Sequence, residues 1–503
     1  MDFIHSANFT NRVEALLKKY LVPGLALAVS YRNDTASLGF GQTHVDAPRR
    51  ACTPDTLFEI ASASKSVTGV ALGILIDEGS HASLSWQSTV SSLLPDDFVM
   101  ATDELTNMLT VEDIISHRSG FPGHDFSIMG INAEHPDTAK SVTRNLRNLE
   151  PSAPIRTRFM YCNMMFTVAS YLVEQLSGRA FPDFLEERVF APLGMASTNL
   201  QPDRARGKGL GGRMTPGHAW DEDAQRYREF FSPESPEAQG AGSIITSVDD
   251  YIKYVRALMY RQAPLTEEVY LGVTNWLIPV ETNAGPLPPG SSPAFYGAGW
   301  EVSWYRGHQL VAHGGSVPGY GTYVFFMPQL ELGGVIFGNA EGANSVNAIL
   351  FRELIDEFLD VPREQRADWE ELEDGRSGGG DGGGDEEREM RELLCPGSET
   401  PEPLPKPLGT YEGVYGNAGY HQLKIEILDG GLFINATDRT LPATITFEHV
   451  CDGTKFVAHQ SSTQAGGDIP MRAEFEVEGE KAARLGLLLE EELDGYIWFD
   501  RVV

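Results

Sequence analysis

The pattern of apolar and polar positions divides the chain into regions of different periodicity. Apolar residues at helical spacing predict an amphipathic helix over about residues 9–20, and two strand-like runs follow at 25–31 and 36–42. Strand patterns then stop until about residue 296, where four runs follow in hairpin-like succession before a helix at about 344–359. This pattern predicts one antiparallel sheet that joins the two ends of the region and is covered by helices, with the mostly helical middle inserted as a second lobe.

The pattern changes in the last part of the chain. Residues 363–406 are rich in charge, Gly and Pro, with glycine triplets at 378–380 and 382–384, so we expect a linker or disordered segment that builds no core. Residues 407–503 alternate polar and apolar positions between turn signals, which predicts a small all-β barrel or sandwich. The expected domains are therefore 1–362, the linker, and 407–503.

Composition excludes some classes of function. The chain has 503 residues, of which 41% are hydrophobic, so it can bury a large core. Its formal net charge of -32 repels polyanions, and nucleic acid is not an expected partner. The N-terminus has no basic region followed by an apolar one, and no stretch is apolar for the length of a membrane span. We expect a soluble, cytoplasmic protein with no membrane partner.

The cysteines point to neither a metal site nor a disulfide framework. Only four occur, and they are scattered along the chain: Cys52, Cys162, Cys395 and Cys451. Reduced thiols suit the cytosol. We expect no metal and no cofactor.

Ser62 is the most informative candidate for chemistry. It stands three residues before Lys65, at the start of an apolar helical run, so both side chains lie on one helix face. A lysine that is desolvated near a helix N-terminus favours its neutral form and can then accept a proton. Alone, the spacing is more typical of a capping serine beside a solvated lysine.

Two further motifs follow Ser62 in the sequence. Tyr161, Cys162 and Asn163 stand just before another apolar helical run, and His313 to Gly315 stand between apolar runs typical of strands. Each is common by itself, since a tyrosine near a helix start is usually core and His-Gly-Gly is usually a turn. Their order and spacing after the serine carry the functional signal.

In these motifs the sequence resembles the serine β-lactamase and penicillin-binding-protein superfamily. The similarity is to the class C-like branch, which includes DD-peptidases, esterases, D-aminopeptidases and acyltransferases and carries SxxK, YxN and KTG or HxG in this order. It covers about residues 8–360 and extends to the phrases at 109–125, 189–200 and 240–254. The resemblance implies a β-lactamase-like α/β (α+β) fold with its active site between the lobes. The YEGVYG segment at 411–416 resembles a lipocalin-like C-terminal domain found in some members.

The resemblance also implies catalytic roles. Ser62 would attack a carbonyl, with Lys65 and Tyr161 sharing the role of base, and the sequence leaves open which of the two takes the proton. Tyr161 would then protonate the leaving group and activate the acceptor. Cys162 falls at a variable position of the family motif, so we interpret it as a small buried side chain.

The remaining motif residues would bind the substrate. By analogy with the family, the oxyanion hole uses the backbone N–H groups of Ser62 and of Ser316, the residue after His313, Gly314 and Gly315. Asn163 would hydrogen-bond to the substrate or to Lys65. His313 replaces the lysine of the commoner KTG, which weakens any permanent positive charge where substrate carboxylates bind.

Three functions fit the sequence. One is a serine hydrolase that cleaves an ester or amide of a small metabolite or D-residue peptide. A second is an acyltransferase or cyclase of a natural-product pathway, and a third is a non-catalytic scaffold, which the intact motifs argue against. The acceptor depends on water exclusion and pocket shape, and we favour the hydrolase because water is always available. The expected partner is a small-molecule or short-peptide acyl substrate, and a homo-oligomer is compatible with this family.

Overall fold

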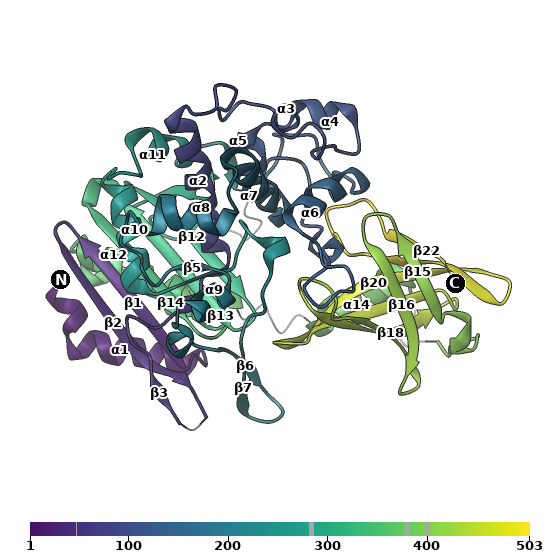
Figure 1. Ribbon diagram of the computed structural model, residues 1–503. Helices are drawn as coiled ribbons and strands as arrows, with labels where there is room; N and C mark the ends of the chain where they lie inside the picture. Colours follow the sequence, from purple (N-terminus) through teal and green to yellow (C-terminus); the bar gives the residue numbers. More distant parts are fainter. Residues whose placement is uncertain (47, 281–285, 378–382, 398–401, 503) are drawn as a thin grey trace.

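The chain folds into an α/β part and, beside it, an all-β part formed by the C-terminal region (Figure 1). The computed structural model describes residues 1–46, 48–280, 286–377, 383–397 and 402–502. The two parts meet where the barrel lies against the helical lobe near α6 (Ala139–Asn145).

A nine-stranded antiparallel sheet forms the centre of the α/β part. Its order, β3-β2-β1-β14-β13-β12-β11-β10-β9, places the first strands of the chain beside the last strand of the region, which confirms the predicted joining of the two ends. The bounds in chain order are β1 Gly24–Tyr31, β2 Asp34–His44, β3 Arg50–Ala51, β9 Ile278–Val280, β10 Ala294–Tyr296, β11 Glu301–Tyr305, β12 His308–Val317, β13 Tyr320–Met327 and β14 Leu332–Gly338.

Side chains alternate between two cores on opposite faces of this sheet. Leu25, Leu27 and Val29 of β1 join the core covered by α1 (Ala7–Lys19) and α12 (Ala343–Phe358). Ala26 and Ala28 join the larger core on the other face, because successive strand residues point in opposite directions. The helices of that core include α2 Ser64–Glu78, α7 Asn163–Ser177, α10 Val248–Met259 and α11 Glu267–Val273.

The inserted lobe is mostly helical but also holds short strands. Its remaining helices are α3 Val90–Leu93, α4 Asp103–Met108, α5 Val111–Ile114, α8 Phe181–Leu185 and α9 Pro202–Gly207. The prediction that strands are absent before about residue 296 is wrong: β4 (Phe58–Glu59), β8 (Ile244–Thr246) and β5 (Asn199–Leu200) form a sheet, and β6 (Gly217–Asp221) pairs with β7 (Arg226–Phe230). These strands are too short to show a clear period of two.

The C-terminal region forms a closed eight-stranded barrel in which sequential strands are neighbours. Its interior is filled by aromatic rings, with Tyr411 and Phe456 each in contact with Phe475. The predicted alternative of a barrel is therefore confirmed. Its strands are β15 Gly413–Asn417, β16 His421–Leu428, β17 Gly431–Ala436, β18 Ala443–Cys451, β19 Lys455–Ser462, β20 Gly466–Glu478, β21 Lys481–Leu487 and β22 Ile497–Arg501.

The first part of the predicted linker is a helix of the α/β part. In α13 (Trp369–Ser377), Trp369 is buried and its Nε1 donates to Asp356 Oδ2 of α12 at 3.3 Å. Glu370 of the same helix forms ion pairs with Arg12 and Lys19 of α1. The prediction of a segment that builds no core is wrong here, because one tryptophan and complementary charges suffice to dock a short helix.

The second part of the linker packs on the barrel. α14 (Gly383–Leu394) lies against β19 and β20, and Leu394 is buried beside Val450 and Val457. Of the glycine triplets, residues 378–380 and 382 lie outside the described residues. A change of domain near these glycines stays a prediction.

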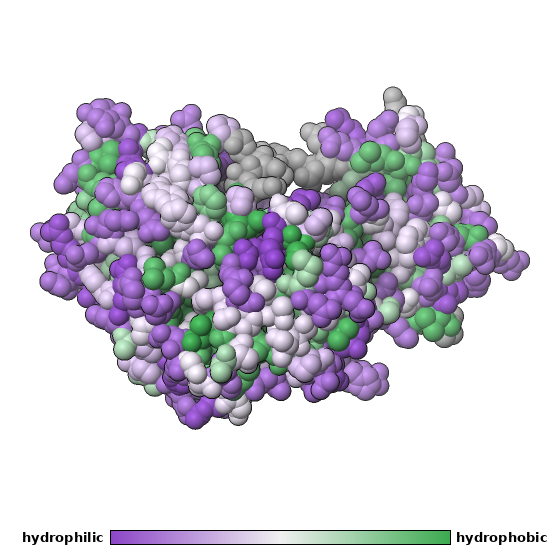
Figure 2. Space-filling model, turned by 90° about the horizontal axis from the view of Figure 1, so that it is seen from above, coloured by the Kyte–Doolittle hydropathy of each residue, from purple (hydrophilic) through white to green (hydrophobic). Residues whose placement is uncertain are grey.

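One face of the molecule is predominantly polar (Figure 2). Figure 2 shows hydrophilic side chains over most of one face, with apolar residues in small, separate groups. This agrees with the formal net charge of -32. None of the helices in the described part of the chain combines the length and the apolar character that crossing a membrane requires.

Candidate active site

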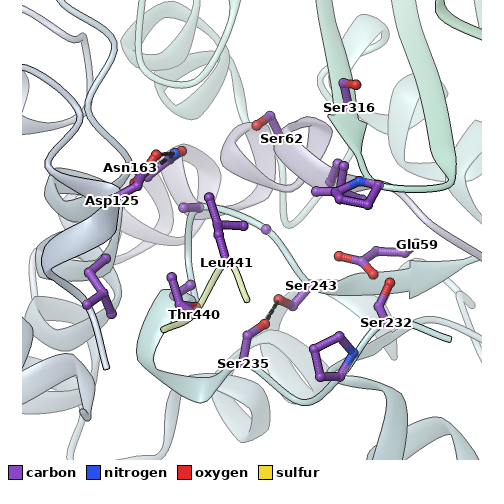
Figure 3. A pocket seen from close by; sticks show the side chains of 18 of the residues that line it. Glu59, Ser62, Asp125, Asn163, Ser232, Ser235, Ser243, Ser316, Thr440 and Leu441 are labelled. Atoms are coloured by element: carbon purple, nitrogen blue, oxygen red, sulfur yellow. Dashed lines mark hydrogen bonds between the residues drawn. The ribbon is translucent and has the colours of Figure 1, made fainter. Parts of the chain in front are cut away.

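Residues of the first two sequence motifs and the residue that follows the third motif meet at one cavity of about 350 Å³. Ser62 reaches it from the turn before α2, Tyr161 and Asn163 from the start of α7, and Ser316 from β12. Figure 3 shows Ser62 between Ser316 on one side and Asn163 on the other. The fold therefore brings together side chains that lie far apart in the sequence.

The turn that carries Ser62 has an unusual backbone conformation. Ser62 stands in a 3-10 turn, Ala61–Ala63, immediately before α2. Ala61 has a φ of 47°, in the left-handed region that residues other than glycine rarely adopt. Such conformations persist where the surrounding structure enforces them, often at functional sites. Here the turn presents the Ser62 hydroxyl to the cavity.

Lys65 is placed to exchange a proton with Ser62. Its Nζ lies 2.9 Å from Ser62 Oγ, and it donates to the carbonyl oxygen of Ala241 at 2.9 Å. The side chain is fully buried, and burial lowers the pKa of Lys65 to about 7, although the nearby Asp125 carboxylate opposes this change. Near neutral pH a large share of Lys65 is thus an amine with a free lone pair.

The Tyr161 side chain lies next to that of Ser62 in the cavity wall. Although 38% of the residue is exposed, the surrounding protein raises the pKa of Tyr161 well above its ordinary value. Its ring stacks on His117 with centroids 4.1 Å apart. His117 is fixed in turn, because its Nδ1 accepts the backbone N–H of Cys162 at 3.0 Å. Tyr161 is therefore a neutral phenol held against a buried ring.

Asn163 pairs with a carboxyl group that the sequence analysis did not assign. Its Nδ2 donates to both oxygens of Asp125, at 3.2 and 3.0 Å. The expected alternatives were the substrate and Lys65, and Lys65 is not its partner among the described contacts. Burial raises the pKa of Asp125, while Asn163 and the Lys65 charge oppose the rise. Asp125 thus places a carboxyl group on one side of the cavity (Figure 3).

His313 is buried in the strand behind the cavity. Its Nε2 accepts from the Tyr296 hydroxyl at 2.8 Å, and its Nδ1 donates to the Gly314 carbonyl at 2.5 Å. Burial and the charge of Lys65 lower the pKa of His313 to about 3, so the ring is neutral. The motif lies within β12 rather than in a turn. His313 thus offers no positive charge to a substrate.

The residues that follow His313 bring β12 close to the turn of Ser62. A side chain at Gly315 would place its Cβ 2.2 Å from the Ile60 carbonyl oxygen and 2.5 Å from Thr322 Oγ1, so only glycine fits. Ser316 lines the cavity, and its Oγ accepts from Asn344 Nδ2 at 2.9 Å. The interpretation of Cys162 as a small buried side chain is confirmed, and burial raises the pKa of its thiol to about 12.

The barrel supplies part of the cavity wall. Thr440 and Leu441, in the turn between β17 and β18, and Gln464, between β19 and β20, line the same cavity as Ser62. Thr440 Oγ1 donates to Glu237 Oε1 at 2.6 Å, which ties this turn to the α/β part. The C-terminal region is thus part of the candidate site.

Backbone and buried polar contacts hold this turn in place. The Thr440 N–H donates to the Ile128 carbonyl at 3.0 Å, and the Gly130 N–H donates to the Asp438 carbonyl at 2.8 Å. Between them, Arg439 is 1% exposed and its guanidinium donates to two barrel carbonyl groups. Since buried charged groups are costly unless hydrogen-bonded, these contacts fix the turn beside Asp125.

Comparison with known proteins gives the family. The sequence profile of the family described as Beta-lactamase matches residues 9–356, which is more than half of the chain. The chain belongs to the β-lactamase family. Residues 398–501, most of the barrel region, match a "Domain of unknown function (DUF3471)". Relatives of this β-lactamase family member include proteins named hydrolase and D-aminopeptidase, and it is an enzyme.

Three relatives illustrate the range of the β-lactamase family around this chain. An unguisins hydrolase of Aspergillus campestris is 32% identical over 98% of this chain and 91% of its own. A D-aminopeptidase of Brucella canis is 28% identical over 70% of this chain and 62% of its own. The octameric penicillin-binding protein homologue from Pyrococcus abyssi superimposes with a TM-score of 0.61 at 20% identity, over 97% of this chain and 99% of its own, which shows the shared fold.

Several residues of the β-lactamase family site were missed in the sequence. Asp125 and Ala241 lie within the family phrases at 109–125 and 240–254, so a carboxylate at the end of the first phrase could have been proposed. Glu59 stands close enough to Ser62 to have been weighed. Nothing in the alternation of the barrel residues marks Thr440, because its role depends on docking between domains.

We expect Tyr161→Phe to lower kcat by about 100-fold. The substitution keeps the ring that stacks on His117 and removes only the hydroxyl that contacts Ser62. Steady-state kinetics against the wild type measure this loss, and far-UV circular dichroism checks the fold. A loss below about 3-fold would assign all proton transfer to other groups, Lys65 above all.

Proposed function

We propose that this enzyme hydrolyses an amide bond of a small peptide or peptide-like metabolite through an acyl-enzyme on Ser62. The observation that carries the proposal is the 2.9 Å contact between Lys65 Nζ and Ser62 Oγ, with burial lowering the pKa of Lys65 to about 7. A neutral amine at this distance can take the serine proton as Oγ attacks a carbonyl. This chemistry agrees with the hydrolase and aminopeptidase names of the relatives.

The two pKa directions support different roles for Lys65 and Tyr161. The pKa of Lys65 is lowered and that of Tyr161 is raised, so lysine suits the base and tyrosine suits the proton donor. In the first step Ser62 Oγ bonds to the carbonyl carbon and its proton passes to Lys65. The C–N bond then breaks, and the leaving nitrogen receives a proton through Tyr161. Water attacks the ester in the second half, which releases the acid and restores Ser62.

The oxyanion of each tetrahedral intermediate needs hydrogen-bond donors. We assign this role to the backbone N–H groups of Ser62 and Ser316, because both residues line the cavity. Gly315 supports the assignment, because its missing side chain lets β12 approach the Ser62 turn closely. Asn163, held by Asp125, is left to position the substrate amide.

The charge of the cavity limits the substrate. None of the described residues that line it is lysine, arginine or histidine, and His313 behind it is neutral. A substrate carboxylate would have no basic partner there, so we propose peptides or amides without a carboxylate near the scissile bond. The unguisins hydrolase relative matches both domains of this chain, so unguisins are the first substrates to test, followed by D-residue peptides.

Intact-mass spectrometry tests the acyl-enzyme directly. The protein is mixed with p-nitrophenyl acetate and quenched in acid, and a mass gain of one acetyl group should map to the peptide that contains Ser62. Repeating the reaction with added alcohols and amines then separates hydrolysis from acyl transfer, because a transferase would form the new ester or amide in preference to the acid. A label on any other residue, or no label during turnover, would contradict the proposal.

We expect kcat/KM to rise with pH through about 7 and then level off. Below its pKa Lys65 is protonated and cannot accept the Ser62 proton, so the rate should fall about tenfold per pH unit on the acid side. A pH series with a neutral substrate measures this limb. It should remain in Tyr161→Phe, and a limb centred below about pH 5 would point to a carboxylate base instead.

Assembly and location stay predictions. The Pyrococcus abyssi homologue is octameric by its title, which makes a homo-oligomer of this chain reasonable to test by light scattering. A cytoplasmic location is the expectation from the sequence.

A further inference from the structure

A second carboxyl group, Glu59, lines the cavity away from Asp125. It lies in β4, three residues before Ser62, and its side chain lies beside that of Ser232 in the segment after β7. Figure 3 shows the Glu59 carboxyl group facing Ser232, with Asp125 and Asn163 across the cavity. The acyl-enzyme mechanism above gives neither Glu59 nor Ser232 a role.

Glu59 has unused hydrogen-bonding capacity. The residue is 8% exposed, and its Oε2 has no hydrogen-bond partner among the described residues. A buried carboxyl oxygen without a donor costs free energy that folding does not recover, so its retention needs a reason. Asp125 differs, because Asn163 donates to both of its oxygens.

The surroundings of Glu59 are acidic. Burial raises the pKa of Glu59, and Glu234 adds to the rise, while Ser232 opposes it, and together they bring the pKa to about 7. Tyr320 of β13 and Arg206 also lie in this environment: Glu59 raises the pKa of Tyr320, and the Arg206 guanidinium lies 3.9 Å from a carboxylate oxygen of Glu234. A positively charged ligand would relieve this repulsion and favour the ionised carboxylate.

We infer that Glu59 and Ser232 form a subsite for a protonated primary amine of the substrate. An ammonium group supplies up to three hydrogen-bond donors, which fit the free Oε2 and the serine hydroxyl. Its positive charge fits a cavity whose described lining residues include no basic side chain. The inference rests on the proposed acyl-enzyme function, since it describes how a substrate is held beside Ser62. It adds a preference for amine-bearing substrates to that function.

Two boronic acids of nearly equal shape test the subsite. The probes are 3-(aminomethyl)phenylboronic acid, which carries an ammonium group, and 3-methylphenylboronic acid, which does not; the 4-substituted pair covers a longer reach. Boron accepts a bond from Ser62 Oγ and becomes tetrahedral, and the serine proton passes to Lys65. The measurement is the ratio of the Ki of the neutral probe to that of the charged probe, in competition with p-nitrophenyl acetate.

The wild-type enzyme should bind one charged probe about tenfold more tightly than its neutral partner. Glu59→Gln keeps the shape and removes the charge, so the ratio should fall to within about 2-fold of one. The matched control is Glu234→Gln, which removes a neighbouring carboxylate that does not line the cavity and should keep most of the preference. The inference would be overturned if the charged and neutral probes of both pairs had equal Ki values in the wild type. It would also be overturned if Glu59→Gln and Glu234→Gln lost the preference for the charged probe to the same extent.

Two further measurements cover the remaining outcomes. If circular dichroism shows that Glu59→Gln does not fold, the Ki ratio of the wild-type enzyme is measured over a pH series instead. The ratio should decline as the pH is lowered through about 7, because Glu59 then loses its charge. A constant ratio from about pH 8.5 to about pH 5.5 would overturn the inference. If no boronic acid inhibits, the acyl-enzyme proposal fails by itself. Calorimetry with benzylammonium and benzyl alcohol then tests the subsite without chemistry, and equal binding of the two would overturn it.

Discussion

Ser62→Ala should lower kcat by about 10⁴-fold or more, because no other described hydroxyl is hydrogen-bonded to Lys65. The hydroxyl lies at a cavity rather than in the core, so the substitution should leave the folded structure and its stability nearly unchanged. Purified protein assayed with p-nitrophenyl acetate and with an amide substrate measures the loss. Intact-mass spectra of the variant should show no acyl adduct.

Ser64→Ala is the matched control for this experiment. Ser64 is a buried serine two residues further on, and its Oγ accepts the backbone N–H of Ile244 at 3.3 Å. Its loss should cost about 1 kcal/mol of stability and leave kcat within about 3-fold of the wild type. Turnover in Ser62→Ala comparable with that of this control would rule out the proposed nucleophile.

Lys65→Arg should lower kcat/KM by about 10³-fold or more, although it keeps a positive charge next to Ser62. A guanidinium group does not lose its proton at accessible pH, whereas the pKa of Lys65 is lowered to about 7 by burial. The variant therefore separates a base from a fixed charge. Kinetics over a pH series should also show that any residual kcat/KM of the variant no longer falls as the pH is lowered through about 7.

Lys253→Arg is the control on the surface. Lys253 forms an ion pair with Asp250 at 2.7 Å and is about half exposed, so the exchange should leave kcat/KM unchanged within about 2-fold. Appreciable activity in Lys65→Arg, with the acid limb unchanged, would mean that Lys65 acts only through its charge. Tyr161 would then have to be the base.

The parts of the fold that repeat a local pattern could be predicted from the sequence. The alternation in β1 and the helical spacing in α1 mark the sheet and its covering helix, since each face must be buried. The α13 helix could not be found in this way, because its stability depends on the docking of Trp369 against α12 and on ion pairs with α1. Composition describes a segment by itself and misses such partners.

The candidate site likewise has a part that could be predicted from the sequence and a part that depends on packing. Ser62 and Lys65 could be paired because one helical turn fixes their distance, and the family motifs added Tyr161 and Asn163. The orientation of His313 away from the cavity, and the contact of Asn163 with Asp125, follow from packing between elements that the sequence does not join. The free oxygen of Glu59 likewise becomes visible only when its neighbours are known.

The turn with Thr440 and Leu441 has a consequence for how such enzymes diversify. The groups proposed to transfer protons lie in the α/β part, while these two wall residues belong to the barrel. Substitutions in the turn can therefore change which molecules fit without disturbing the Ser62–Lys65 pair. The residues that carry out the reaction and some of those that select the substrate thus lie in different parts of the chain. Evolution can therefore change the substrate through substitutions in a barrel turn, while the reaction stays the same.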